Sequence, residues 1–460
     1  MFKIFPTLFV AAFFLASAFG VSAAVLTVTT TEDTDDGVCD AQCSLREAID
    51  AAGYGDTIIF AREIRGGTIQ LTRTLAPAVG KYVKIDGPNR RRITLKGDNK
   101  FRIIESHGNL WIDGLIIRDG NAVEGDGGGI LATGTLNLTN IAIINNSARR
   151  GGGIYISGGG LLILADSLVA DNTAKGDSSA GGIDAYFHPT MWINNSTISG
   201  NRSLSIIDGV GGLRLNTVES CSIVSSTIAF NTSNGTSTTS AGGIAASSIT
   251  DFGPIANVIL AKNSSLNNPD HFRGFSARNS LIGISSPTSG LVNGVNGNIV
   301  GSVAAPAEPL LGPLSDNGGL QTHEPQTGSP AIDSGNNALA TDRRNVPLIA
   351  DQRGFIRVAN DVVDMGSHET TSQLSIRPST VKGQAVNAAG RGIAGARVEL
   401  RNSSGEVRYA TTNPFGFFQF LDVDPDQTYS FNCLHKWNAF AEQSVLVEEG
   451  VEYIKFVASK

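Results

Sequence analysis

Aromatic and charged residues are scarce in this chain. Phe, Trp and Tyr make up 7% of its 460 residues and Asp, Glu, Lys and Arg 17%, whereas glycine occupies 54 positions. Between residues 64 and 300 the apolar residues show no helical period, which excludes a helical bundle. The formal net charge of −7 argues against nucleic acid or an anionic membrane surface as a partner.

Long apolar runs are absent except at the N-terminus, where residues 4–19 follow Lys3. A positive end, a short apolar run and the small residues Val21-Ser22-Ala23 form the pattern of a secretory signal. The run is short for a membrane anchor, and small residues follow it instead of a charged stop. The sequence therefore predicts a signal peptide over residues 1–23, export of the mature chain, and no membrane span once the signal is removed.

Cysteine occurs four times, at Cys39, Cys43, Cys221 and Cys433. In an exported protein Cys39 and Cys43 are close enough to form a structural disulfide. No partner His or Cys cluster lies nearby, so no metal site is predicted. Cys221 and Cys433 are interpreted as buried thiols, and the sequence leaves their pairing open.

Glycine is abundant because a Gly-Gly-apolar unit recurs along the chain. Its apolar residue is Ile130, Ile154, Ile183, Leu213 and Ile244, at intervals of 24, 29, 30 and 31 residues. A second marker, an apolar strand ending in Asn, keeps the same step. Its Asn residues are Asn146, Asn172, Asn201, Asn231 and Asn263, at intervals of 26, 29, 30 and 32. Two markers that drift together indicate one structural unit repeated, with insertions in its loops.

A unit of roughly 25 to 30 residues holding about three short strands is typical of one coil of a parallel β-helix. A propeller blade needs four antiparallel strands and a longer period. The region resembles the right-handed parallel β-helix proteins of the pectin-lyase-like fold, which include pectate lyases. We expect an all-β chain: a parallel β-helix over residues 64–300 with an N-terminal helical cap, then a small β-sandwich. The Asn row is expected to bond to turn backbone, which we favour over a catalytic role.

Residues 24–63 are predicted to cap the first coil. Ser44 and Glu47 form a capping box at the start of a short amphipathic helix, beside a strand at residues 57–60. Residues 43–49, Cys-Ser-Leu-Arg-Glu-Ala-Ile, resemble the signature of exported bacterial proteins named after the CSLREA motif. This resemblance implies architecture and a secreted or cell-surface address in a bacterium more than any activity.

The other end of the β-helix also needs a cover, because bare strand edges promote aggregation. Residues 301–369 are expected to supply it as C-terminal coils and a closing segment. Four polar pieces carry this expectation: 314–319, 328–335, 351–354 and 364–369. They resemble the closing segment of exported β-helix proteins labelled choice-of-anchor.

Residues 370–379 are polar and are predicted to be a linker. In residues 380–460, alternating strands and Gly turns indicate a β-sandwich. The module resembles the carboxypeptidase regulatory-like domain. That resemblance implies an accessory part that spaces, stabilises or binds.

Aligning the coils on the Gly-Gly-apolar residue predicts which side chains face outward, because directions alternate along a strand. The outward candidates that share one surface are Tyr155, Asp184, Tyr186, His188, Arg214 and Asn216. Aromatic faces stack on sugar rings, while carboxylate, guanidinium and amide groups hold hydroxyls. We interpret this set as a candidate glycan contact. The competing interpretation is an ordinary cross-strand ion pair of Asp184 with Arg214 on a solvated face.

Enzyme activity requires more than this patch. A lyase of this fold would need a Ca²⁺ cluster of carboxylates and a base, and a hydrolase two or three close carboxylates. The sequence places no such cluster on one face. A second polar set has two interpretations, a metal or acid/base constellation and the hydrogen-bonded framework of the closing segment, and we favour the framework. Its members are His323, Asp333, Asp351, Arg353, Asp364 and Glu369.

The favoured function is therefore a non-catalytic binding or adhesion module for glycans or envelope proteins, without a cofactor. The alternatives are a β-helix polysaccharide lyase or glycoside hydrolase, and a structural spacer.

Overall fold

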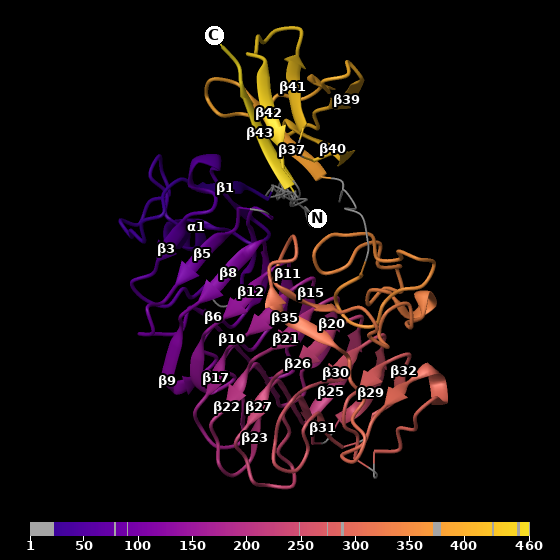
Figure 1. Ribbon diagram of the computed structural model, residues 1–460. Coiled ribbons are helices and arrows are strands. Elements are labelled where there is room, and N and C mark those ends of the chain that lie inside the picture. Colours follow the sequence, from indigo (N-terminus) through magenta and orange to yellow (C-terminus); the bar gives the residue numbers. More distant parts are fainter. Residues whose placement is uncertain are drawn as a thin grey trace, which may run out of the picture.

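A computed structural model describes residues 23–77, 80–89, 91–247, 249–273, 275–286, 289–370, 379–425, 427–448 and 451–459. The predicted signal lies outside the described residues except for Ala23, and so does most of the predicted linker. The chain forms a parallel β-solenoid of about 8 turns over residues 25–272, followed by a small antiparallel domain (Figure 1). The predicted fold class is confirmed. No helix in the described part of the chain is long and apolar enough to cross a membrane.

Three long parallel sheets build the walls of the solenoid, here named sheets 1, 2 and 3. Sheet 1 contains, in spatial order, β1 (Val25–Val28), β2 (Thr57–Phe60), β4 (Tyr82–Asp86), β7 (Asn109–Asp113), β11 (Leu136–Thr139), β15 (Leu161–Ala165), β20 (Thr190–Asn194), β25 (Val218–Val224), β29 (Ile249–Ala256) and β32 (Ala277–Arg278). Sheet 2 contains β31 (His271–Phe272), β28 (Ile244–Ala246), β24 (Leu213–Asn216), β19 (Ile183–Tyr186), β14 (Ile154–Ser157), β10 (Ile130–Ala132) and β6 (Ile104–Ser106). Sheet 3 contains β3 (Thr68–Gln70), β5 (Ile93–Lys96), β8 (Leu115–Arg118), β12 (Ala142–Ile144), β16 (Leu168–Ala170), β21 (Thr197–Ser199), β26 (Thr227–Ala229), β30 (Ile259–Ala261), β33 (Leu281–Ile282) and β34 (Ile299–Val300).

Short strands between sheets 3 and 2 add two smaller ladders. The first contains β27 (Thr232–Ser233), β22 (Arg202–Ser203), β17 (Thr173–Ala174), β13 (Ser147–Arg150) and β9 (Asn121–Asp126). The second pairs β18 (Ser179–Ala180) with β23 (Gly209–Val210). Strands β9, β13, β17, β22 and β27 follow the same corner in successive coils and therefore belong to the repeating unit, whereas β18 and β23 lie in the loop insertions that the drifting repeat interval indicated.

The repeat marker stacks as predicted. Sheet 2 pairs the apolar residues in one file, in the order Ile130, Ile154, Ile183, Leu213 and Ile244. Each is at most 1% exposed. One buried aliphatic side chain per coil therefore forms a continuous column, and burial of this column stabilises every coil through its neighbours.

The Asn row forms a buried hydrogen-bonded ladder. The Nδ2 group of Asn172 donates to Oδ1 of Asn201 at 2.9 Å, and Asn201 donates to Asn231 in the same way at 2.9 Å. Each Nδ2 group also donates to a strand carbonyl, as Asn201 does to Val169 at 2.9 Å. The ladder satisfies backbone groups at a tight corner, the structural role expected for it.

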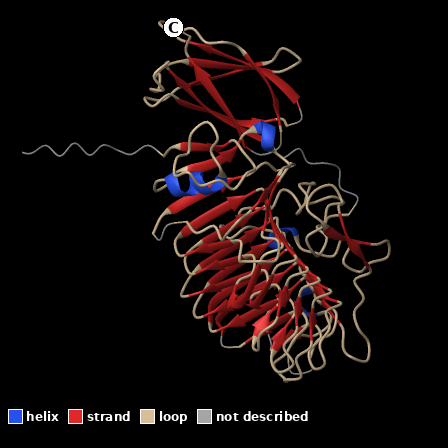
Figure 2. Ribbon diagram, turned by 90° about the vertical axis from the view of Figure 1, so that its left-hand side faces the viewer, coloured by secondary structure: helices blue, strands red, loops and turns tan. Residues whose placement is uncertain are grey.

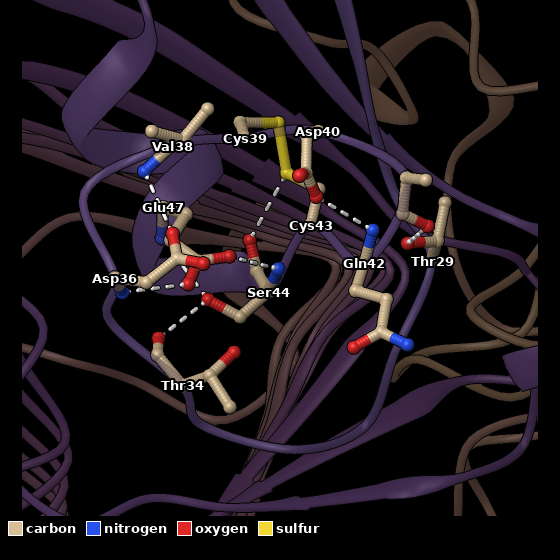
Figure 3. The surroundings of a disulfide bond; sticks show 11 residues. Thr29, Thr34, Asp36, Val38, Cys39, Asp40, Gln42, Cys43, Ser44 and Glu47 are labelled. Carbon is tan, nitrogen blue, oxygen red and sulfur yellow. Dashed lines mark hydrogen bonds between the residues drawn. A yellow bond between two sulfur atoms is a disulfide. The ribbon is translucent and has the colours of Figure 1, made fainter.

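The N-terminal cap contains helix α1 (Leu45–Ala51), which begins with the predicted capping box (Figure 3). Glu47 accepts the backbone N–H of Ser44 at 2.8 Å and that of Asp36 at 3.1 Å, and these bonds hold its pKa below the ordinary value. A disulfide joins Cys39 to Cys43 just before the helix. Strands β1 and β2 belong to sheet 1, so the cap also extends the solenoid wall.

The closing segment lies along the flank of the solenoid. Strands β35 (Leu311–Ser315) and β36 (Thr322–Pro325) form an antiparallel pair, accompanied by the 3-10 helices η2 (Val295–Gly297) and η3 (Asn337–Leu339). Leu314 and Leu320 pack on the outer face of sheet 3 against Ala142 and Leu168. The sequence analysis expected a cover for the end of the solenoid. The flank attracts this segment because the outer face of sheet 3 presents apolar side chains such as Leu168 together with hydroxyls, and those of Thr197 and Ser199 bond to Gln352 and His323.

The second polar set forms buried contacts within and beneath this segment. Ring atom Nε2 of His323 lies 2.7 Å from Oγ of Ser199, and Arg353 pairs with Asp351 at 2.6 Å. Asp364 accepts the backbone N–H of Asp333 at 2.7 Å. Glu369 accepts the backbone N–H of Asp364 at 3.0 Å.

The C-terminal module consists of a three-stranded and a four-stranded sheet, with phenylalanines in its core. Its strands are β37 (Ser379–Val386), β38 (Arg397–Arg401), β39 (Val407–Thr411), β40 (Phe417–Val423), β41 (Gln427–Leu434), β42 (Gln443–Val447) and β43 (Val451–Val457). The module sits beside the first coils (Figure 2). There Arg65 pairs with Glu452 at 2.9 Å, next to the 3-10 helix η1 (Arg62–Ile64). Cys221 and Cys433 are buried free thiols.

Candidate functional site

The structure aligns the predicted glycan residues on the outer side of sheet 2. Tyr155, Asp184 and Arg214 are register partners on β14, β19 and β24. Tyr186 and Asn216 are partners in the same way, two positions further along. The Gly-Gly-apolar alignment therefore found neighbours that are 29 and 30 residues apart.

Three of these residues are less accessible than an exposed patch requires. Tyr155 is 6% exposed, Asp184 0% and Arg214 8%. They point away from the apolar column, but the backbone around Ser178 and Ala180 folds over them. Ala180 donates its N–H to Asp184 Oδ2 at 3.1 Å, and Arg214 donates to the Ser178 carbonyl. The repeat interval after Ile154 is longer than the one before it. Its extra residues form β18, which covers the row of Tyr155, Asp184 and Arg214.

An ionic network extends the buried row toward β9 and β13. Arg150 donates from Nε to Asp126 Oδ1 at 3.0 Å, and its guanidinium carbon lies 4.7 Å from the centroid of the Tyr155 ring and 5.6 Å from that of Tyr186. Arg149 pairs with the same carboxylate at 2.9 Å. Arg150 and Asp126 escaped the sequence analysis because they end β13 and β9, outside the positions that the Gly-Gly-apolar alignment covers. The Arg150 guanidinium, held by Asp126, therefore lies against the rings of Tyr155 and Tyr186.

Asp184 is the most strongly buried acid of this network. Burial raises the pKa of its carboxyl from 3.8 to about 6, although Arg214 and the Ala180 N–H lower it. Nη1 of Arg214 lies 3.6 Å from Oδ1 of Asp184, and this oxygen has no hydrogen-bond partner. The carboxylate is therefore only partly compensated for the loss of water.

Replacing Asp184 with Asn should change the pH dependence of stability. Since the folded pKa lies above the unfolded one, the native protein binds the extra proton between pH 3.8 and about 6. The parent should lose up to about 3 kcal/mol of stability relative to Asp184→Asn as pH rises through this window. Urea unfolding of both proteins from pH 4 to 8 measures the difference. A difference that does not vary with pH would contradict this expectation.

The accessible part of the site is an aromatic turn that follows β19, made of Tyr186, Phe187 and His188. Phe187 is 58% exposed, and its ring centroid lies 6.1 Å from that of Tyr186 and 5.4 Å from that of His188. Phe187 and His188 have φ values of 67° and 64°, a left-handed backbone that bulky residues rarely adopt. The same left-handed backbone recurs at other turns of the solenoid, such as Asp166, Asp171 and Thr217, so it belongs to the turn geometry of the coils.

The preceding coil leaves a bare backbone shelf beside this turn. Its residues are Gly158 and Gly159, and Gly159 donates its N–H to the Phe187 carbonyl at 2.9 Å. A Cβ on Gly159 would meet no atom within 4 Å, and one on Gly158 only Thr133 at 3.9 Å. The position that a Cβ would take is therefore open at Gly159 and in ordinary van der Waals contact at Gly158. We call these two residues the glycine shelf.

The following coil supplies polar groups on the other side of the turn. Asn216 accepts the Phe187 N–H through its carbonyl at 3.2 Å, and its Oδ1 accepts from the Thr217 hydroxyl at 3.1 Å. The turn is thus flanked by open backbone on one side and by amide and hydroxyl groups on the other. The sequence signal for the shelf was present but unused: the Gly158–Gly160 run stands one repeat before Phe187.

Comparisons with known proteins do not assign the chain: no family model matches it, and neither does any curated protein. In the part of the chain that the structure describes, no group of three or more His, Cys, Asp or Glu side chains could hold a metal ion.

Proposed function

We propose that the protein is a non-catalytic glycan-binding module and that the aromatic turn is its contact surface. The observation that carries this proposal is the exposed cluster of three rings beside the glycine shelf. A sugar ring has an apolar face that stacks on an aromatic side chain, and hydroxyls that bond to amides. The shelf leaves space for such a ring above Phe187, and Asn216 offers an amide beside it.

We further propose that the chain belongs with exported bacterial β-helix proteins of the CSLREA and choice-of-anchor type, and that it ends in a carboxypeptidase regulatory-like domain. The motif at residues 43–49 supports the first part, since its Ser44 and Glu47 build the helix cap. The Cys39–Cys43 disulfide supports export, because such bonds persist in oxidising compartments. The two-sheet module at the C-terminus supports the last part.

The rival function is glycoside hydrolysis, and one observation favours it. Asp184 has a pKa of about 6, which suits a general acid. However, its side chain is fully buried beneath the backbone of β18, so a substrate at the aromatic turn does not touch it. We therefore assign Asp184 to the support of Tyr155 and Tyr186.

A binding experiment tests the proposal. The parent is screened on a glycan array, and the best ligand is titrated into the parent, Phe187→Ala and Phe415→Ala. Phe415 is the matched control, because it is 54% exposed but lies in the C-terminal module. Loss of the Phe187 ring should weaken binding about tenfold, or about 1.4 kcal/mol, without changing the control. Equal affinity of all three proteins would contradict the proposal, as would a parent that binds no glycan.

Incubation of the parent with acidic and neutral polysaccharides separates binding from catalysis. We expect neither new reducing ends nor unsaturated uronates, with or without Ca²⁺. Either product would favour the hydrolase or the lyase.

A further inference from the structure

A second surface, remote from the aromatic turn, lies between the first coils and the C-terminal module. It is a cleft of about 840 Å³, within the usual size range of ligand sites. One wall comes from β1, β2 and η1, and the other from β37, β39, β40 and β43. Sites between domains are common because two rigid walls present groups from opposite sides.

Cationic side chains dominate the charged groups of this cleft. Arg62, Lys382 and Lys455 line it, and none of them forms an ion pair with the residues that the structure describes. Arg65 also lines it but is neutralised by Glu452 at 2.9 Å and Glu448 at 3.3 Å. Three uncompensated cations in a chain of net charge −7 create a local attraction for anions.

The remaining lining suits a sugar more than a simple ion. The ring of Tyr409 and the amide of Gln419 line the same space. Tyr409 is 52% exposed, although the Arg397 guanidinium lies 3.7 Å from the centroid of its ring. Tyr453 and Gln384 also line the cleft but are engaged within the protein, Tyr453 with Lys382 and Asp86 and Gln384 with the Phe415 carbonyl. A cavity of this volume accommodates more than one sugar unit, whereas an inorganic anion would leave Tyr409 and Gln419 unused.

The outer face of sheet 1 continues the surface beyond the cleft. Thr57, which lines the cleft, is the register partner of Lys84, and Lys84 is the partner of Trp111. Trp111 is 38% exposed and packs edge-on against Tyr82, with ring centroids 5.4 Å apart. Lys84 is paired with Asp86 at 2.8 Å. Neighbouring strands are about 4.8 Å apart, so an extended chain leaving the cleft passes this ion pair and meets the Tyr82–Trp111 aromatic pair within two strand spacings.

We propose that this cleft binds an oligosaccharide that carries carboxylates. Lys382, Lys455 and Arg62 pair with the carboxylates, the exposed ring of Tyr409 stacks on a sugar ring, and the chain leaves over the Lys84–Asp86 pair toward Trp111. Binding bridges the solenoid and the C-terminal module, which the Arg65–Glu452 pair already holds together. None of the residues that line this cleft belongs to the aromatic turn, and the proposal of an anionic ligand does not depend on the function proposed for that turn.

Fluorescently labelled hexagalacturonate is the probe, titrated by polarisation at 50 mM salt. We expect Lys382→Gln with Lys455→Gln to weaken binding at least tenfold. Lys436→Gln is the matched control, because Lys436 contacts the Trp437 ring outside the cleft, and it should stay within twofold of the parent. Phe187→Ala should bind as the parent does, which separates this site from the aromatic turn. Higher salt should weaken binding by screening the charges.

The proposal is overturned if the parent does not bind hexagalacturonate or if the double variant binds it equally well. If neutral cellohexaose bound as tightly as hexagalacturonate, charge would not contribute to binding and the proposal would be wrong. Equal affinity for hexaglutamate would show that the cleft selects any polyanion, and would also overturn it. Unchanged thermal unfolding of the variants establishes that they are folded.

Discussion

Replacing Asn201 with Ala should destabilise the solenoid by about 3–5 kcal/mol. The Oδ1 atom of Asn201 accepts two hydrogen bonds from Asn172, one from the backbone N–H at 3.1 Å and one from the side-chain Nδ2 group at 2.9 Å. The Nδ2 group of Asn201 donates to the Val169 carbonyl and to Asn231, both at 2.9 Å. The substitution leaves several buried polar groups without partners, and each costs about 1–3 kcal/mol. Urea unfolding followed by circular dichroism measures the loss.

Asn137→Ala is the matched control for this prediction. Asn137 also stands on a coil of the solenoid, but it is partly exposed and its side chain accepts only a weak bond from the Thr139 hydroxyl at 3.5 Å among the described residues. Its removal should change the free energy of unfolding by less than about 0.5 kcal/mol. Similar losses in both variants would show that the ladder contributes nothing beyond any other Asn.

Gly181→Ala is the second substitution from which we expect a large effect. A Cβ at this position would lie 2.4 Å from the backbone N and 2.5 Å from the carbonyl O of Arg202. Those atoms are backbone and cannot rotate away, so the coils must separate and the bond from Gly181 N to Val210 O, now 3.0 Å, must weaken. We expect a loss of about 3 kcal/mol. For a cooperative unit the size of the solenoid, residues 25–272, that is a fall of roughly 6–12 °C in Tm.

Calorimetry of Gly181→Ala beside Gly125→Ala checks this expectation. A Cβ at Gly125 would approach two side-chain atoms and no backbone: Nη2 of Arg102 at 3.0 Å and Cβ of Ala122 at 3.6 Å. A shift of a few tenths of an ångström in Nη2 relieves the closer contact, because the bonds that hold Arg102 come from Nε and Nη1. The control should therefore melt within about 2 °C of the parent. A Gly181 variant as stable as this control would show that the coils have more room than the structure gives them.

The register of the coils was predictable because it follows from side-chain type. Ile154 must stack on Ile183 for both to be buried, and a slip of one residue would expose both. The Asn ladder was predictable for the same reason, since a buried amide needs a partner. The capping box at Ser44 and Glu47 was local and therefore visible in the sequence.

The cover over the predicted patch could not be predicted in this way. Strand β18 has two residues, Ser179 and Ala180, which carry no pattern of alternating hydrophobicity. Its position depends on contacts with Asp184 and Arg214 that form only after the coils stack. The contact of Arg65 with Glu452 spans 387 residues and has no periodic signal at all. The exposed Phe187 was missed because its left-handed turn reverses the expected alternation of directions.

A crystal structure of the protein with the tightest ligand from the glycan array tests the proposed function most directly. We expect a sugar ring against Phe187 and above the glycine shelf, with a hydroxyl in hydrogen-bond distance of the Asn216 amide. A neutral ligand bound elsewhere, with the aromatic turn unoccupied, would contradict the assignment of this surface.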